Sequence, residues 1–244
     1  MKIMIIGGTS GIGLALAKHY AKQGVQLALC SRDITRLDSH ELRTDPRVRT
    51  YQLDIADHVA LIRTVHDFGK GGLDMLIVTA GQYADTVGLA LQPGLGLRVV
   101  QTNILGLAQT FDTAAALMQR QGHGHLVAVA SVAGLLKEYP GGSLYSASKR
   151  AAIGICDAYR KALRPYGIAV TVIVPGYVDT AGLRQLNQGD VRAKPFLQSE
   201  PDAVRRIVHA IEQRAGRCIF PWQLHMMVRL FNSLPSTIQR LRQK

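Results

Sequence analysis

The sequence has few cysteines and few aromatic residues, and no hydrophobic run long enough to span a membrane. Cys30, Cys156 and Cys218 lie far apart and form neither a C-x-x-C pair nor a Cys/His cluster. Neither a disulfide framework nor a zinc site is indicated, so no metal is expected. The first residues, up to a glycine-rich turn, do not resemble a targeting segment. Together these features predict a protein of the reducing cytoplasm.

Acidic residues are also scarce. The chain has 29 Lys and Arg against 17 Asp and Glu, a formal net charge of +12. This excess suggests an anionic partner, such as a phosphate-bearing cofactor or substrate, a membrane surface or a nucleic acid, although it also simply favours solubility. The basic residues are dispersed, no nucleic-acid module is visible, and aromatic residues make up only 6%. We therefore expect no nucleic-acid partner.

What is present is typical of one α/β domain. The 244 residues are 47% hydrophobic and include 24 glycines, enough for a large buried core. Short apolar runs alternate with longer segments of helical period, as in βα units around a parallel sheet. The pattern predicts a single doubly wound Rossmann-type domain over residues 1–244. Strands are expected at 3–6, 26–30, 49–53, 75–79, 126–130, 169–174 and 218–220, and helices at 12–23, 34–42, 57–68, 95–121, 145–164 and 201–214.

Two segments do not fit the alternation. Residues 176–198 form an irregular insertion, typical of a loop or lid over a substrate. It ends at Ser199, followed by Pro201 and Asp202, which predicts an N-cap and the first turn of a helix. Residues 221–244 combine apolar and basic residues and contain no acid. We expect this amphipathic tail to pack over the substrate cleft or against another subunit, and peripheral membrane contact is the less favoured alternative.

Three glycines follow the first strand in the pattern Gly7-x-x-x-Gly11-x-Gly13 and open the first helix. Glycine lets a phosphate approach the backbone, and a helix N-terminus offers free N–H groups and the positive end of a dipole. A tight turn alone would also use glycine. Its place at the first strand-to-helix junction favours dinucleotide binding.

The end of the second strand reads Ser31-Arg32-Asp33. An NAD site usually places an acid here, on the adenosine ribose. With Ser31 in that place, no carboxylate repels a 2′-phosphate, and the guanidinium of Arg32 can pair with it. NADP(H) is therefore preferred, and NAD(H) is the alternative if the Asp33 carboxylate turns toward the ribose.

Tyr145 and Lys149 are four residues apart at the start of a helical stretch, so they share a helix face. A nearby ammonium lowers the pKa of a phenol and makes it a usable proton donor or acceptor. The simpler interpretation is a surface tyrosine beside a solvated lysine. Ser131 ends the fifth strand, at the edge of the sheet where ligands bind in such folds. Its hydroxyl can hydrogen-bond a substrate carbonyl.

The order and spacing of several short motifs resemble the short-chain dehydrogenase/reductase family, from residue 3 to about 220. The motifs are Gly7-Gly8-Thr9-Ser10-Gly11-Ile12-Gly13, Leu53-Asp54, Ala80-Gly81, Asn103, Ser131-Val132-Ala133-Gly134, Tyr145-Ser146-Ala147-Ser148-Lys149 and Pro175-Gly176-Tyr177-Val178-Asp179-Thr180.

The resemblance implies an oxidoreductase that interconverts a ketone or aldehyde and the corresponding alcohol. In the implied roles, Tyr145 is the general acid or base, Lys149 binds the nicotinamide ribose, Ser131 orients the carbonyl and Asn103 holds a water. The implied cofactor residues are Gly7, Thr9, Ser10, Gly11, Ile12, Gly13, Ser31, Arg32, Asp54, Ile55, Ala80, Gly81, Tyr145, Lys149, Pro175, Gly176, Val178 and Thr180.

Two departures from the family pattern stand out. Val78-Thr79 replaces a pair of asparagines, which predicts altered hydrogen bonding beside the cofactor, and Ile6 replaces a threonine before the first glycine. The altered segment and the basic tail also leave open an alternative function, an NADP(H)-binding regulatory or interaction protein with little turnover.

The substrate is less well defined by the sequence. Recognition residues are expected in 135–142, 177–198 and the tail, and apolar residues there favour a hydrophobic carbonyl compound. The resemblance also implies a homodimer or homotetramer, paired through the long helices at 95–121 and 145–164.

Overall fold

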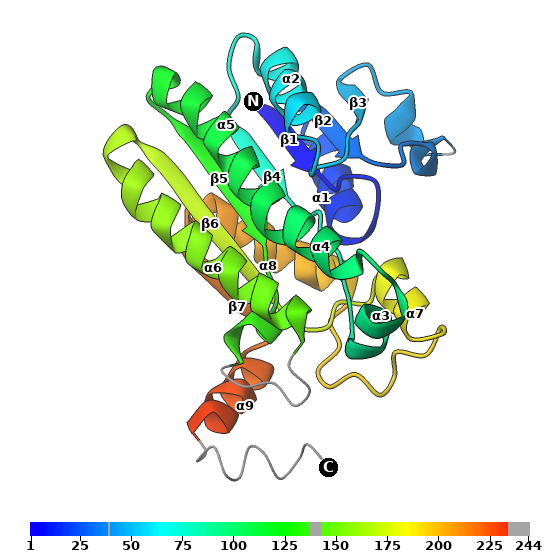
Figure 1. Ribbon diagram of the computed structural model, residues 1–244. Helices are drawn as coiled ribbons and strands as arrows, with labels where there is room; N and C mark the ends of the chain where they lie inside the picture. Colours follow the sequence, from blue (N-terminus) through cyan, green and yellow to red (C-terminus); the bar gives the residue numbers. More distant parts are fainter. Residues whose placement is uncertain (39, 137–142, 234–244) are drawn as a thin grey trace.

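A seven-stranded parallel sheet forms the centre of the protein (Figure 1), as seen in a computed structural model that describes residues 1–38, 40–136 and 143–233. The strand order is β3-β2-β1-β4-β5-β6-β7. The strands are β1 (Lys2–Ile6), β2 (Gln26–Ser31), β3 (Val48–Gln52), β4 (Met75–Val78), β5 (Gly124–Val129), β6 (Ile168–Pro175) and β7 (Arg217–Phe220). The predicted doubly wound Rossmann-type fold and all seven strands are confirmed, with boundaries shifted by no more than two residues.

Helices cover both faces of the sheet (Figure 1). They are α1 (Gly11–Ala21), α2 (His58–Gly69), α3 (Thr86–Leu91), α4 (Leu95–Val100), α5 (Leu107–Gln121), α6 (Leu144–Leu163), α7 (Ala181–Leu186), α8 (Glu200–Glu212) and α9 (Trp222–Ser233). Alternate residues of the strands face opposite sides. Met4 and Ile6 join the core under α2, α5 and α6, whereas Ile3 and Ile5 join the core under α1 and α8. This two-sided burial explains why the strand sequences are apolar throughout.

One predicted helix is wrong. Residues 34–42 form two short 3₁₀ turns, Thr35–Leu37 and Glu41–Arg43, instead of an α-helix. Local polar side chains compete with a helical ladder here. Asp33 accepts from the backbone N–H of Thr35, and the His40 ring accepts from that of Leu42. Each bond starts a new turn, so the described residues of this segment form no continuous helix.

The long helix predicted over 95–121 is present but interrupted. Between α4 and α5 the backbone adopts a π-helical turn, Gln101–Gly106, which contains Asn103. Such bulges inside α-helices are frequent at functional sites. The helix predicted over 201–214 is α8, and its Ser199 hydroxyl accepts from the backbone N–H of Asp202. This N-cap is confirmed.

The insertion and the tail contain short helices that the sequence pattern did not predict. α7 lies inside the insertion, and Val178 forms a parallel bridge with Gln198 at its other end. In the tail, α9 buries Leu224 and Val228 and exposes Trp222. Within residues 1–38, 40–136 and 143–233, no helix is long and apolar enough to cross a membrane.

Candidate active site

The glycine turn between β1 and α1 is packed too tightly for side chains. Gly7 has φ +92°, in the left-handed region, and a Cβ there would lie 2.6 Å from the backbone nitrogen of Ala80. A Cβ on Gly13 would lie 2.2 Å from the carbonyl oxygen of Gly7. Ser10 precedes α1 without a side-chain cap bond, and the first turn of α1 contains no acid. The turn therefore leaves a helix N-terminus open to an anion, as a dinucleotide site requires.

Thr79, which stands where the family has an asparagine, forms hydrogen bonds to the glycine turn. Its hydroxyl lies 3.1 Å from the carbonyl oxygens of both Ile6 and Gly7. The backbone N–H groups of Thr79 and Ala80 also donate to the Ile6 carbonyl, at 2.8 and 3.0 Å. The predicted change in hydrogen bonding is thus a direct link from the end of β4 to the glycine turn. The same bonds hold the turn at Ile6, where the family threonine is absent.

Arg32 and Asp33, the two charged residues after β2 that could contact the adenosine ribose, have different surroundings. The Asp33 carboxylate accepts from the backbone N–H and hydroxyl of Thr35 and pairs with Arg36 at 3.1 Å. These contacts hold the pKa of Asp33 below its ordinary value, with the Thr35 hydroxyl bond as the largest cause. Arg32 is exposed and has no ion pair among the described residues. The carboxylate is therefore engaged locally, while the guanidinium faces outward.

Asp54 and Ile55 follow β3, the outermost strand of the sheet, next to β2. The Asp54 carboxylate accepts from the backbone N–H of Ala56 at 3.0 Å and pairs with Arg98 of α4 at 3.3 Å. Ile55 is buried, and a Cβ on Gly106 would lie 2.9 Å from it. The junction between α4 and α5 is thus fixed against the loop after β3.

Tyr145 lies in the first turn of α6 and meets Ser131, which follows β5. The Ser131 oxygen accepts from the backbone N–H of Ala133 at 3.2 Å, so its own proton is available to the hydrogen bond with Tyr145. The pKa of Tyr145 lies above its ordinary value because burial outweighs that bond, which lowers it. This direction is the reverse of the lowering expected from Lys149. The phenol is thus protonated at neutral pH, as it also is at its ordinary pKa, and this is the form that a proton donor needs.

Lys149 lies one turn further along α6 and is buried. Its ammonium donates to the carbonyl oxygen of Val129 at 3.0 Å and lies 5.8 Å from the centre of the Tyr145 ring. Burial lowers the pKa of Lys149 to about 8, so most of the group is still charged at pH 7. A Cβ on Gly81 would lie 3.2 Å from the Lys149 nitrogen, which brings the end of β4 to the same point.

Asn103 lies in the π-helical turn and is buried. Its side-chain oxygen accepts from the backbone N–H of Gln82, and its nitrogen donates to the Gln82 carbonyl and to the Ser148 hydroxyl. Ser148 in turn donates to the Tyr145 carbonyl at 2.7 Å. Both amide hydrogens of Asn103 are therefore used within the protein, and they link the end of β4 to the helix that carries Tyr145.

The segment after β6 closes the other side of the site. Gly176 donates its backbone N–H to the Phe220 carbonyl at 2.7 Å, and Val178 is buried. Thr180 caps α7, and a Cβ on Gly11 would lie 3.6 Å from it. The glycine turn and the Pro175–Thr180 motif, far apart in the sequence, thus lie in contact.

The structure also brings forward residues that the sequence did not single out. The Tyr83 ring packs on that of Tyr145, with centroids 5.0 Å apart. Ser148 and Gln82 belong to the Asn103 network, and Arg98 to the cofactor edge. No signal in the sequence could have identified these residues. The Asn103 network depends on the π-helical turn, and such an interruption of a helix has no clear sequence pattern. Of the expected recognition segment 135–142, residues 137–142, including Tyr139, lie outside the described residues, as does the tail from 234.

Comparison with known proteins shows the family and the fold of the chain. A sequence profile of the short chain dehydrogenase family matches residues 1–191. An uncharacterized oxidoreductase of Mycobacterium tuberculosis (strain CDC 1551 / Oshkosh) is 30% identical, with 98% of this chain and 96% of that protein covered. Two solved structures share the fold. A short chain dehydrogenase from Burkholderia cenocepacia J2315 in complex with NADP has a TM-score of 0.81 at 19% identity, covering 99% and 96% of the two chains. A short-chain dehydrogenase from Sphingobium yanoikuyae in complex with NADPH has a TM-score of 0.80 at 24% identity, covering 96% of each chain.

The fold and the glycine turn define a Rossmann-type oxidoreductase. The chain belongs to the short-chain dehydrogenase/reductase family.

Proposed function

We propose that the protein is an NADPH-dependent reductase that interconverts a ketone or aldehyde and the corresponding alcohol. The observation that carries this proposal is the hydrogen bond of Ser131 with Tyr145, together with the buried Lys149 ammonium 5.8 Å from the centre of the Tyr145 ring. When bound, the nicotinamide would supply or accept the hydride at the carbonyl carbon. The protein's own residues would handle the proton and the developing charge on the oxygen.

Three residues divide this work in the proposed reaction. The Tyr145 hydroxyl gives its proton to the carbonyl oxygen during reduction and takes it back during oxidation. The Ser131 hydroxyl donates to the same oxygen and orients the carbonyl. The Lys149 ammonium stabilises negative charge on Tyr145 after the proton leaves. Asn103 positions Tyr145 through Ser148, and a water held by Asn103 would use the remaining acceptor capacity of its oxygen.

The residues at the edge of the sheet fit a phosphorylated dinucleotide. Side chains at Gly7 and Gly13 would fill the space against the backbone, and α1 presents its N-terminus without an acid. Because Asp33 is engaged with Thr35 and Arg36, the exposed Arg32 is the group that would meet a 2′-phosphate. Two solved structures of the same fold, those from Burkholderia cenocepacia and Sphingobium yanoikuyae, are complexes with NADP and NADPH. We infer a preference for NADP(H) over NAD(H) on these grounds.

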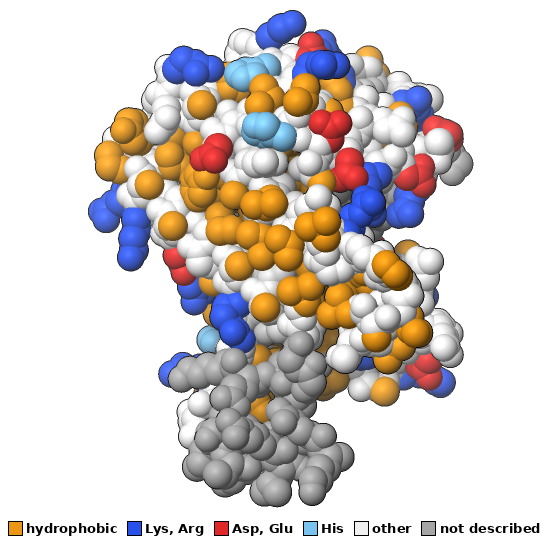
Figure 2. All heavy atoms as spheres, in the orientation of Figure 1, with side chains coloured by type: hydrophobic (Ala, Val, Ile, Leu, Met, Phe, Trp, Pro, Cys, Tyr) orange, Lys and Arg blue, Asp and Glu red, His pale blue; other side chains and the backbone are white. Residues whose placement is uncertain are grey.

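We further propose a hydrophobic carbonyl substrate and a homo-oligomer. Tyr83 and Tyr145 present an aromatic wall beside the reacting oxygen, and α9 lies next to Leu135 through the bond from Asn232 to its carbonyl at 2.8 Å. Figure 2 shows hydrophobic side chains gathered across the middle of the face that carries α5 and α6. Leu105, on the π-helical turn before α5, is half-exposed. Pairing of two copies through this face would bury it. The predicted cytoplasmic location stays a prediction.

The test is the Tyr145→Phe variant, with Tyr166→Phe as the control because Tyr166 is exposed on the far 3₁₀ turn. NADPH oxidation is followed with a panel of hydrophobic ketones and aldehydes, and NADPH binding is measured by fluorescence. We expect Tyr145→Phe to lose turnover by about 10²-fold or more while NADPH binding survives. A Phe variant with near-normal turnover would show that Tyr145 is not the acid.

The alternative of an NADP(H)-binding regulator with little turnover loses much of its support. It depended partly on the altered Val78-Thr79 segment, and the Thr79 hydroxyl takes over the link to the glycine turn. Tight NADPH binding without oxidation of NADPH by any carbonyl compound in the panel would bring it back.

A further inference from the structure

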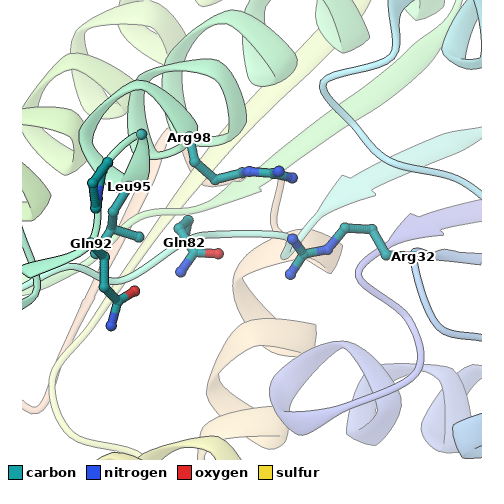
Figure 3. A pocket seen from close by; sticks show the side chains of 7 residues that line it. Arg32, Gln82, Gln92, Leu95 and Arg98 are labelled. Carbon is teal, nitrogen blue, oxygen red and sulfur yellow. The ribbon is translucent and has the colours of Figure 1, made fainter.

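A cavity of about 300 Å³ lies between Arg32, which follows β2, and Arg98 of α4. Gln82 and Gln92 add amide groups to its wall, and the turn at 93–95 closes one side. Figure 3 shows the side chains of Arg32 and Arg98 extending into the same space from opposite sides, with Gln82 beside them. Among the described residues, no carboxylate lines this cavity. We call it the two-arginine cavity.

Two cations that face one cavity repel each other unless an anion lies between them. Arg32 has no ion pair among the described residues, so its charge is not neutralised locally. Arg98 uses Nη1 for Asp54 and leaves its other donors uncommitted in the described part of the chain. A guanidinium has five donors in a planar fork, which suits the oxygens of a phosphate monoester. The donors that line the cavity therefore suit a small dianion.

The position of the cavity in the fold indicates which phosphate group would bind there. Arg32 directly follows Ser31, at the strand end that faces the adenosine ribose in such folds. Gln82 directly follows Gly81, and Asp54 holds Arg98 at the loop after β3. Arg32 and Asp54 follow β2 and β3, on the opposite side of the sheet from β5 and β6, whereas Tyr145 and Lys149 lie on α6, which packs on β6. Gln82 follows β4, between these two groups in the strand order.

We propose that Arg98 is a second reader of the cofactor's 2′-phosphate, which it grips from α4 while Arg32 grips it from β2. This inference rests on the proposed function, because it assigns a further specificity-determining residue to the same cofactor site. The Asp54 carboxylate holds the Arg98 side chain in place before the phosphate arrives. The pre-placed fork then loses less side-chain freedom on binding.

The test measures binding, not turnover. Calorimetry on the full chain compares 2′,5′-ADP with 5′-ADP, and NADPH with NADH, for the wild type and for Arg98→Gln. Arg98 is about half exposed, so solvent screening keeps the expected effect moderate. We expect Arg98→Gln to weaken 2′,5′-ADP and NADPH by about tenfold, or about 1.4 kcal/mol, and to leave 5′-ADP and NADH within about twofold. Arg98→Lys should recover part of the loss, because it keeps the charge without the fork.

The matched control is Arg205→Gln on α8. It also removes one positive charge and one Arg–Asp contact, that with Asp202, but at a distant helix. An equal loss in this variant would reduce the effect to overall charge and overturn the proposal. So would an Arg98→Gln variant that weakens all four ligands alike, or none of them.

The two proposals fail in different ways. A wild type that prefers NADPH, loses that preference in Arg32→Gln and keeps it in Arg98→Gln would sink the role of Arg98 and leave the proposed function standing. A wild type that binds none of the four ligands would sink the proposed function itself. A wild type that binds 2′,5′-ADP no better than 5′-ADP would overturn the phosphate site and leave carbonyl reduction to be judged with NADH.

Discussion

The side chain of Asn103 holds the backbone of Gln82 at two points. Its Oδ1 accepts from the Gln82 N–H at 2.7 Å, and its Nδ2 donates to the Gln82 carbonyl at 2.9 Å. This clamp places the next residue, Tyr83, with its ring on Tyr145. The expected catalytic asparagine is therefore also the residue that shapes the loop beside the catalytic tyrosine.

Replacement of Asn103 by alanine should loosen this loop. The change leaves two backbone groups of Gln82 and the Ser148 hydroxyl without their partner, at a cost of about 1–3 kcal/mol in the free energy of unfolding. We expect carbonyl reduction to fall by a larger factor than NADPH affinity. Denaturant unfolding and a kcat-against-Kd comparison check this. The exchange Gln82→Ala is the control for stability, because it keeps the backbone groups of the clamp, and it should leave the free energy of unfolding nearly unchanged. If Asn103→Ala is as stable as the wild type, the clamp is not a source of stability.

The exchange Thr79→Val should weaken both the fold and the cofactor site. Valine has the shape of threonine but lacks the hydroxyl that reaches the Ile6 and Gly7 carbonyls. We expect a loss of about 1 kcal/mol in the free energy of unfolding and weaker NADPH binding, because the glycine turn is less firmly held. Thr79→Ser keeps the hydroxyl and should stay close to the wild type in both measurements. Equal behaviour of the valine and serine variants would contradict this role of the hydroxyl.

Lys149 should cost the protein stability at neutral pH. Its pKa is lowered by burial to about 8 from an unfolded value near 10.4. Between these values the unfolded chain binds more protons, so stability rises with pH across that window and the cost is fully present below it. Lys149→Met should therefore be about 1–2 kcal/mol more stable at pH 7, less the bond to Val129, while turnover is lost. Thermal unfolding at pH 7 and pH 10 checks this, and the gain should shrink at pH 10. Lys161→Met on the exposed side of α6 is the control, and a Lys149→Met variant less stable than the wild type at pH 7 would contradict the prediction.

The buried ring of His125 should make the protein less stable in mild acid. It is buried in β5, with Nε2 2.8 Å from the Thr171 hydroxyl, which itself donates to the Ala215 carbonyl. The ring must therefore donate from Nε2 and is neutral. Burial, with a smaller effect of Arg214, lowers its pKa to about 4.

The pKa of His125 in the unfolded chain is near 6.5. Above that pH the ring is neutral in both states, and burying it costs no stability. The free energy of unfolding falls as the pH drops from 6.5 to 4, by about 3 kcal/mol in total, because the unfolded chain takes up a proton that the buried ring does not. Urea unfolding at pH 7 and pH 5 should show the decline, and His125→Gln should flatten it. The same slope in both proteins would assign the acid sensitivity to other groups.

The sequence by itself determined the sheet and most of the reacting groups. Apolar strands alternating with helical segments predict the parallel sheet, because both faces of each strand must be buried. Motifs of consecutive residues, such as Gly7 to Gly13 and Tyr145 to Lys149, were visible because their members are neighbours on one turn or one helix face. The single false helix, at 34–42, failed where side chains of Asp33 and His40 bond their own backbone. Such bonds depend on rotamers that periodicity does not record.

The tertiary structure alone decided which distant residues meet. Thr79 reaches the Gly7 carbonyl, Thr180 lies on Gly11, and Arg98 faces Arg32 across a cavity. These pairs are separated by many residues and join only because parallel strands bring all their carboxyl ends to one edge of the sheet. The direction of the Tyr145 pKa was also decided there. Burial depends on what packs around the phenol, and neighbours along the chain do not reveal it.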